Sequence, residues 1–440
     1  MRVKRVLFCL LFLVLMLTAC TILDGTNGVE EPVPVTQEPA TPVVAVDPQI
    51  TPVVEIQPTP TPEAVGLKIW IPPEIANRTE EGAQILAEQL REFNDKYPDV
   101  TLMVEQKQAR GTGGILSYLR TGRAVAPTVL PDVVALPTEL LPTAGNENLI
   151  FAMDETIDPS AMDPLFPSAS QLSQPQESIL GYPFALSGVT HIVFNSNVMT
   201  STLPLTWERL ISNPERNMVM PAGGSDSALL ALQFYLDAGG QVENDLGQPI
   251  MELDPLKVAL NALQDGRESG FIIEQSSRIS TEDQAWQIFL GGGANIVRTS
   301  ADHFLGENTA GLPVEYTVTP GIDRPLTPLT TGWAWAVSTP DEVQQALAME
   351  LIQDLVTAQN LGAWSQESDI LPSRKDALET WTVNEAYTDF IEQELDRADP
   401  LPVNSSSKFI TVLGDAAFQV ISGAKSADEA AEDALEAFQS

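Results

Sequence analysis

Short apolar segments alternate with amphipathic ones in the first part of the chain's body, and this alternation limits the fold more than any other feature. Leu67–Ile71 ("LKIWI") is typical of a strand, as are "VTLMVEQ" at residues 100–106 and "PDVVAL" at residues 131–136. Apolar residues between the first two strands recur at steps of four, three and four, which predicts a helix: Leu86, Leu90, Phe93 and Tyr97. Because strands that alternate with helices pair in parallel through crossover helices, the sequence predicts an α/β fold.

The second half of the chain continues the same pattern. Residues 181–195 ("GYPFALSGVTHIVFN") read as one extended stretch, and residues 330–339 ("TTGWAWAVST") as a strand that leads into a helix. Thr339, Pro340 and Glu342 predict a capping box with Thr339 as the N-cap, and Ser426 with Glu429 predicts another before the last helix. About 370 residues follow position 66, which favours two lobes over one compact core.

The N-terminal residues predict export and a membrane anchor. Three basic residues precede an apolar stretch at residues 6–19, which is too short for a comfortable permanent span. The "LTAC" at residues 17–20 then resembles the lipobox of bacterial lipoproteins, in which the cysteine carries lipid and residues 1–19 are removed. Alternatives are a secreted protein with an incidental Cys20 or an uncleaved anchor. Each of these places the remaining chain outside the cytoplasm.

Residues 20–66 predict a tether between Cys20 and the folded body. This segment is rich in Pro, Thr, Val and Glu and lacks the aromatic residues that would build a core. We expect an extended spacer.

Cysteine content and charge exclude several functions. Beyond Cys9 and Cys20 the chain has no thiol, so the body has no disulfide, thiolate metal site or cysteine nucleophile. The 60 acidic residues outnumber the 23 basic ones, and the formal net charge is −37. Such a surface repels nucleic acids and anionic lipids, so we expect membrane contact through the lipid anchor only.

The order of the segments resembles the extracellular solute-binding proteins of ABC importers, of the maltodextrin-binding type. The motifs that carry this resemblance are "EFNDKYPDV" at 92–100, "PDVVAL" at 131–136, "GYPFAL" and "IVFN" within 181–195, "LPLTWERL" at 203–210, "FLGGGANIV" at 289–297, "TTGWAWAV" at 330–337, "LPSRKDAL" at 371–378 and "ISGAKSADEAAEDAL" at 421–435. Residues 291–297 depart from the Gly-Lys-Ala-Ala-Met-like run that is more usual in the family.

The resemblance implies two α/β lobes joined by hinge strands, with the ligand held between them. Lobe 1 would comprise residues 67–184 and 320–371, and lobe 2 residues 185–319 and 372–440. A sugar would be captured in the cleft and delivered to the permease subunits of an ABC transporter. We expect a monomer with no cofactor and no metal site.

Candidate ligand-binding residues follow from where open α/β sheets bind small molecules, at the carboxyl ends of strands. The loops at those ends are 72–79, 110–114, 137–139, 221–226, 298–303 and 331–335. A sugar needs flat rings beneath its C–H faces and polar groups at its hydroxyl edges. The candidates are therefore the rings of Trp70, Phe184, Trp333 and Trp335 and the polar side chains of Glu74, Asn77, Arg78, Glu139, Asp226 and Arg298. The resemblance adds Gly332, where the family's cleft-lining turn falls, and so ranks Trp333 first among the rings. For the three tryptophans the alternative is core packing, for Arg298 an ion pair with a neighbouring acid, for Glu74 a solvated loop charge, and for residues 221–226 an ordinary tight turn.

Other functions are weighed against a sugar-binding protein. A tethered carbohydrate hydrolase is one, although the chain has two histidines and no HExxH, G-x-S-x-G or Walker motif. A binding protein for a polyamine, phosphodiester or peptide is another. A purely structural surface protein fits the anchor but not the order of the segments. We expect a binding protein and not an enzyme.

Overall fold

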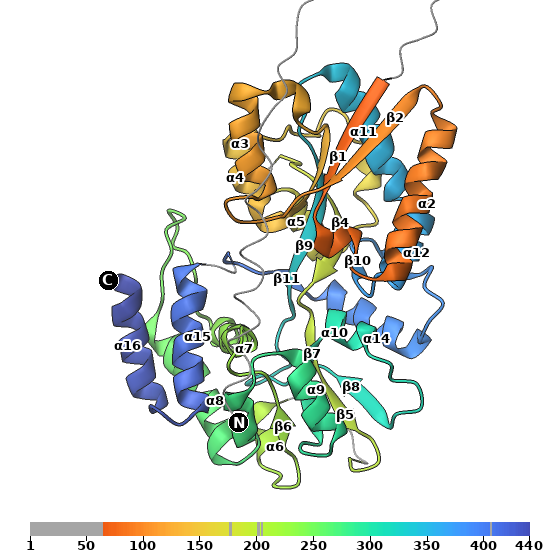
Figure 1. The fold of residues 1–440 in the computed structure, drawn as a ribbon. Helices are drawn as coiled ribbons and strands as arrows, with labels where there is room; N and C mark the ends of the chain where they lie inside the picture. The colour runs from red at the N-terminus through yellow and green to blue at the C-terminus, as the bar shows by residue number, and fades with distance from the viewer. Residues whose placement is uncertain (1–64, 176–177, 200–202, 204–205, 405–406) are drawn as a thin grey trace, which may run out of the picture. The chain divides into compact units, whose positions relative to one another are not determined.

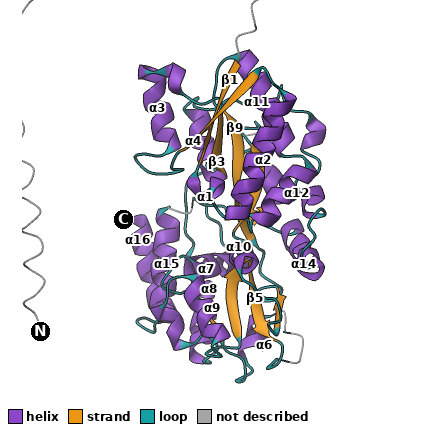
Figure 2. Cartoon of the chain, turned by 45° about the vertical axis from the view of Figure 1, so that its right-hand side comes forward, coloured by secondary structure: helices purple, strands orange, loops and turns teal. Residues whose placement is uncertain are grey.

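The computed structural model describes residues 65–440 except 176–177, 200–202, 204–205 and 405–406 (Figure 1). The predicted signal segment, Cys20 and the tether up to residue 64 therefore lie outside the described residues, whereas residues 65 and 66 begin the first strand and not the predicted spacer. The described chain forms a 7-stranded sheet and a 4-stranded sheet with helices packed on them (Figure 2). The predicted α/β class is confirmed.

The larger sheet combines a parallel part with an antiparallel part. Its order is β10-β4-β9-β3-β1-β2, and β11 pairs with β9. β1 is parallel to β2 and β3, whereas β9 is antiparallel to β3 and β4. The bounds are β1 (Val65–Ile71), β2 (Val100–Gln106), β3 (Val133–Pro137), β4 (Tyr182–Ser187), β9 (Leu329–Val337), β10 (Leu371–Pro372) and β11 (Asp399–Pro400). The first three strands match the predicted ones closely.

Side chains that alternate along these strands build two apolar layers. Ile69, Val133 and Trp335 face the layer that includes Leu86 and Phe93, whereas Trp70, Val134 and Ala334 face the other layer. One layer is covered by α2 (Glu80–Lys96), α11 (Glu342–Leu355) and α12 (Ala358–Glu367), and the other by α3 (Ile115–Val125) and α4 (Leu141–Asn146) (Figures 1 and 2).

The smaller sheet has the order β6-β7-β5-β8, and β6 and β7 are parallel. Its strands are β5 (Thr190–Asn195), β6 (Met218–Val219), β7 (Ile296–Ser300) and β8 (Val314–Thr317). An apolar cluster joins this sheet to a group of helices: α6 (Trp207–Ile211), α7 (Asp226–Asp237), α8 (Leu253–Glu268), α15 (Lys408–Ile421) and α16 (Ala427–Gln439). Helices α9 (Glu282–Leu290) and α10 (Ala301–Gly306) flank β7.

The remaining helices lie in the connections between these elements. They are α1 (Pro73–Ala76), α5 (Pro167–Ser173), α13 (Lys375–Leu378), α14 (Glu385–Asp396) and the 3-10 helices η1 (Pro127–Val129), η2 (Thr138–Leu140), η3 (Pro159–Ala161) and η4 (Glu274–Arg278). None of the helices in the described part of the chain is both long and apolar enough to cross a membrane.

Residues 181–195 form two strands of different sheets and not one continuous stretch. Gly188 separates β4 from β5 with φ of +93°, a left-handed conformation that glycine adopts without a side-chain clash. The chain returns to the larger sheet between β8 and β9 and leaves it again after β11 for α15. The chain therefore passes between the two sheets at three places within residues 65–440.

One of the two predicted helix caps is wrong. The helix after β9 begins at Glu342, and its N-cap is Asp341, whose carboxylate accepts from the backbone N–H groups of Val343 and Gln344. A carboxylate that reaches two free N–H groups caps better than Thr339, which lies two residues earlier. The capping box of Ser426 with Glu429 is confirmed.

Candidate ligand site at the strand ends

The carboxyl ends of parallel strands gather the candidate residues at one edge of each sheet. β1, β2 and β3 end at the same edge of the larger sheet, and β6 and β7 at the same edge of the smaller one. Arg78 follows β1 and Asp302 follows β7, and the Arg78 Nη2 lies 3.9 Å from the Asp302 Oδ2. The strand-end edges of the two sheets therefore lie close together at this point.

Arg78 is also held by the C-terminal end of α12. Its Nε donates to the carbonyl oxygen of Ser368 at 2.7 Å, and its Nη2 donates to that of Asp369 at 3.2 Å. Burial raises the pKa of Asp302 to about 6, and the nearby Arg78 opposes this rise. Arg78 therefore links the segment after β1 to the start of α10 and to the C-terminal end of α12.

The other polar candidates of the larger sheet lie on the same edge. The Arg110 Nε donates to the Glu139 Oε1 at 2.9 Å, and the Asn77 Nδ2 donates to the Gln106 Oε1 at 2.9 Å. Glu74 is exposed on α1. The partners Arg110 and Gln106 were not singled out from the sequence, although residues 110–114 were expected to form a loop here.

Only one of the four candidate rings combines a place at this edge with partial exposure. Trp333 lies opposite Pro137, the last residue of β3, and its side chain is half-buried. Trp335 stacks on Phe184 with ring centroids 4.8 Å apart, and both are core residues. Trp70 is 4% exposed and packs edge-on against Tyr118.

Gly332 places the Trp333 ring next to the loop after β3. Its N–H donates to the Thr138 Oγ1 at 3.2 Å. A Cβ at this position would lie 2.7 Å from the carbonyl oxygen of Ala185, so the close approach of β9 and β4 requires glycine.

Asp226 and Arg298 form an internal ion pair of the smaller sheet. The Arg298 side chain is 0% exposed, and its Nη2 donates to the Thr190 Oγ1 and the Gln233 Oε1 at 2.8 Å each. Burial lowers the pKa of Arg298 to about 9. These contacts tie β7, β5 and α7 together, as the ion-pair alternative expected.

Three cavities in the described part of the chain have volumes suited to small ligands, and the one of about 530 Å³ lies among α2, β2 and residues 71–77. The other two adjoin α7 or the loop before it. One, of about 440 Å³, is lined by the loop 222–225, residues 277–280 and one face of α15. The other, of about 470 Å³, lies among α5, α7, β9 and β11, and its polar lining residues include Gln171, Gln233, Asp237, Arg324 and Asp399. The loop 221–226 was predicted to lie at the site, whereas the α15 wall was not.

Comparison with known proteins identifies the family of the chain. Residues 88–389 match the model of the bacterial extracellular solute-binding proteins. A search of curated proteins gives no match.

Among solved structures, a cyclo/maltodextrin-binding protein in complex with maltotetraose is 17% identical, with a TM-score of 0.69 over 87% of this chain and 98% of that one. The sugar-binding protein MalE of Xanthomonas citri is 16% identical, with a TM-score of 0.68 over 84% and 96%. The maltose-binding MalE of Listeria monocytogenes is 14% identical, with a TM-score of 0.67 over 86% and 97%. These likenesses confirm the expected two-lobed fold. Because the family model covers more than half of the sequence, the chain belongs to the bacterial extracellular solute-binding proteins.

Proposed function

We propose that this protein captures a carbohydrate, a mono- or oligosaccharide, between the two strand-end edges and delivers it to the permease subunits of an ABC importer. The observation that carries the proposal is the register of β3 and β9, which sets the half-buried Trp333 ring beside the start of η2. The paired Glu139 and Arg110 side chains belong to the same edge. A flat ring next to charged hydrogen-bonding groups is the combination that a sugar requires.

The solved structures with maltose and maltotetraose bound support a sugar as the ligand class, since they share this fold. The family is extracellular, which supports a location outside the cytoplasm. We further infer that Cys20 carries the lipid anchor, that residues 20–64 form the tether and that the protein acts as a monomer. We also propose one lobe around each sheet, with the predicted bounds at residues 184 and 371 moved so that β4 to residue 187 and β10 to β11 at residue 400 stay with the larger sheet.

Calorimetry with a ligand panel tests the proposal. We expect saturable binding of at least one of glucose, maltose, maltotriose and maltotetraose, and none of spermidine, a glycerophosphodiester or a tripeptide. Tight binding of only one of the latter three would replace the sugar by that class. Release of shorter sugars from a bound oligosaccharide, followed by chromatography, would instead favour the hydrolase.

The variants Trp333→Ala and Trp333→Phe identify the ring that carries binding. We expect at least a tenfold loss of sugar affinity in the alanine variant, because it removes the stacking surface. The phenylalanine variant should retain most of the affinity, because it keeps a flat ring. Equal affinities in all three proteins would place the sugar elsewhere.

A further inference from the structure

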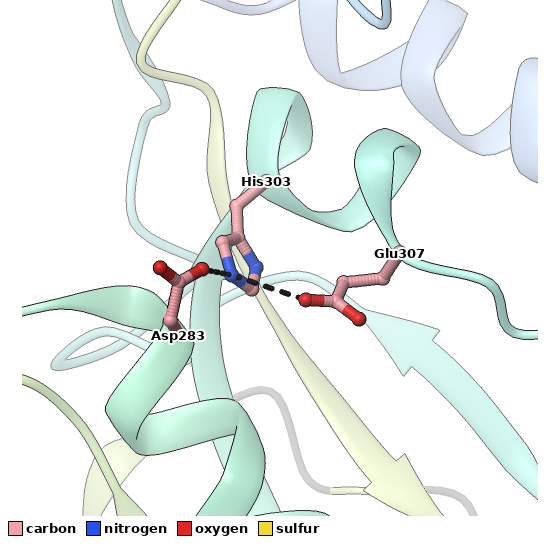
Figure 3. Close-up of side chains that lie close together, drawn as sticks. All are labelled: Asp283, His303 and Glu307. Carbon is pink, nitrogen blue, oxygen red and sulfur yellow. Dashed lines mark hydrogen bonds and ion pairs between the residues drawn. The ribbon is translucent and has the colours of Figure 1, made fainter.

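Three side chains on the part of the chain built around the smaller sheet bring potential metal ligands together (Figure 3). Asp283 lies in the first turn of α9, His303 lies in α10, and Glu307 follows α10 directly. One ligand atom from each lies within 4.8 Å of the other two. None of these three residues is among those proposed above to contact the sugar.

The distances suit a shared ion. The His303 Nε2 lies 3.0 Å from the Asp283 Oδ1 and 3.5 Å from the Glu307 Oε1. Ligand atoms that each lie about 2.1 Å from a tetrahedral Zn²⁺ are about 3.4 Å apart. The cluster therefore needs only small side-chain movements to coordinate one ion.

The imidazole of His303 is already oriented toward the two carboxylates. Its Nδ1 lies 3.1 Å from the Thr299 Oγ1, and this contact directs the Nε2 to the other side of the ring, where Figure 3 shows Asp283 and Glu307. A second contact of this kind on the far ring nitrogen is typical of metal-binding histidines.

The surrounding structure fixes the two helices that carry the ligands. The Ser300 Oγ donates to the Glu282 Oε2 at 2.9 Å. The Ser300 Oγ also accepts from the backbone N–H of His303 at 3.2 Å. The Trp286 ring packs edge-on against His303 with centroids 5.8 Å apart. The start of α9 is therefore tied to the start of α10.

We propose that Asp283, His303 and Glu307 bind a divalent transition-metal ion of the Zn²⁺ class. One imidazole nitrogen and two carboxylate oxygens suit such an ion, whereas Ca²⁺ and Mg²⁺ favour sites made of oxygen alone. Asp283 is 83% exposed, so water can complete the coordination. This site was not predicted from the sequence, because Asp283 lies 20 residues before His303 and no short ligand motif joins them.

Calorimetry with Zn²⁺ on the purified, chelator-treated chain tests this site. We expect one ion per chain, with tighter binding than Ca²⁺. Co²⁺ as a second probe should give visible absorption bands that disappear when His303 is replaced. The variants His303→Ala, Asp283→Asn and Glu307→Gln should each lower the Zn²⁺ affinity at least tenfold.

Asp254→Asn is the matched control, because Asp254 is also an exposed acid in the first turn of a helix, α8. It should change the Zn²⁺ affinity less than twofold. Asp283→Asn alters an exposed side chain, so it remains informative if His303→Ala fails to fold. The proposal is wrong if the chain shows no saturable Zn²⁺ binding up to about 100 µM. It is also wrong if Asp283→Asn binds Zn²⁺ as tightly as the parent chain does. The cluster would then be only a histidine that contacts two carboxylates, with no role in metal binding.

Discussion

At the scale of single residues, Gly332 lies where β9 approaches β4 so closely that a side chain has no room. A Cβ there would lie 2.7 Å from a backbone oxygen of β4, and backbone cannot move aside as a flexible side chain can. We expect Gly332→Ala to lower the free energy of unfolding by about 1–3 kcal/mol in urea denaturation. Gly113→Ala is the control, since nothing lies within 4 Å of its added Cβ. An equal effect of the two substitutions would contradict this explanation.

His191 gives a residue-scale prediction for pH. Its side chain is fully buried among the rings of Phe304, Tyr387 and Phe390, and burial lowers its pKa to about 3. Because the unfolded chain takes up a proton below about pH 6.5 and the folded chain does not, the free energy of unfolding falls as the pH falls from about 6.5 to 3. Between pH 7 and 5 this one group accounts for a loss of about 2 kcal/mol.

Replacement of His191 by Phe tests that loss. The variant removes the titrating ring and keeps an aromatic side chain among Phe304, Tyr387 and Phe390. Its free energy of unfolding should therefore fall less between pH 7 and 5. Urea denaturation at both pH values measures the difference. Parallel losses in the two proteins would show that other groups cause the pH dependence.

At the scale of elements, Asp341 provides a test of the corrected helix start. Its carboxylate accepts from two backbone N–H groups at the start of α11. Asp341→Ala should lower the free energy of unfolding by about 1 kcal/mol, whereas Asp341→Asn should retain most of the cap. Thermal denaturation of the three proteins distinguishes this cap from the predicted one at Thr339, which would leave Asp341→Ala neutral.

The strands show what a local pattern can predict. The apolar runs of β1, β2 and β3 were located from the sequence because each lies between clear helix or turn signals. The division of residues 181–195 was not foreseen, since both halves are apolar and only the conformation of Gly188 separates them. Trp333 and Trp335 point to the same side of β9, so the sequence could not tell which ring is core. The stacking of Trp335 on Phe184 makes that distinction.

The candidate site was harder to predict because its parts come from distant segments. Arg298 looked like a strand-end ligand, but its partners Thr190 and Gln233 lie far away in the sequence and enclose it. The α15 face of the 440 Å³ cavity lies almost 190 residues after the loop 222–225 that forms the opposite wall. The periodicity of a sequence predicts single helices and strands. Contacts between residues of distant segments depend on how those elements pack, which periodicity does not predict.

At the scale of the whole molecule, the three chain passages between the sheets predict a hinge. A ligand that contacts both strand-end edges makes interactions in a closed state that an open state lacks, so its binding should shift the population toward closure. We expect the radius of gyration from small-angle X-ray scattering to fall when the sugar identified by calorimetry is added. The Trp333→Ala variant at the same sugar concentration should show no fall, because little sugar is bound. An unchanged profile of the parent chain under saturating sugar would mean that the ligand binds without bringing the two sheets closer, and the role proposed for both edges would then be wrong.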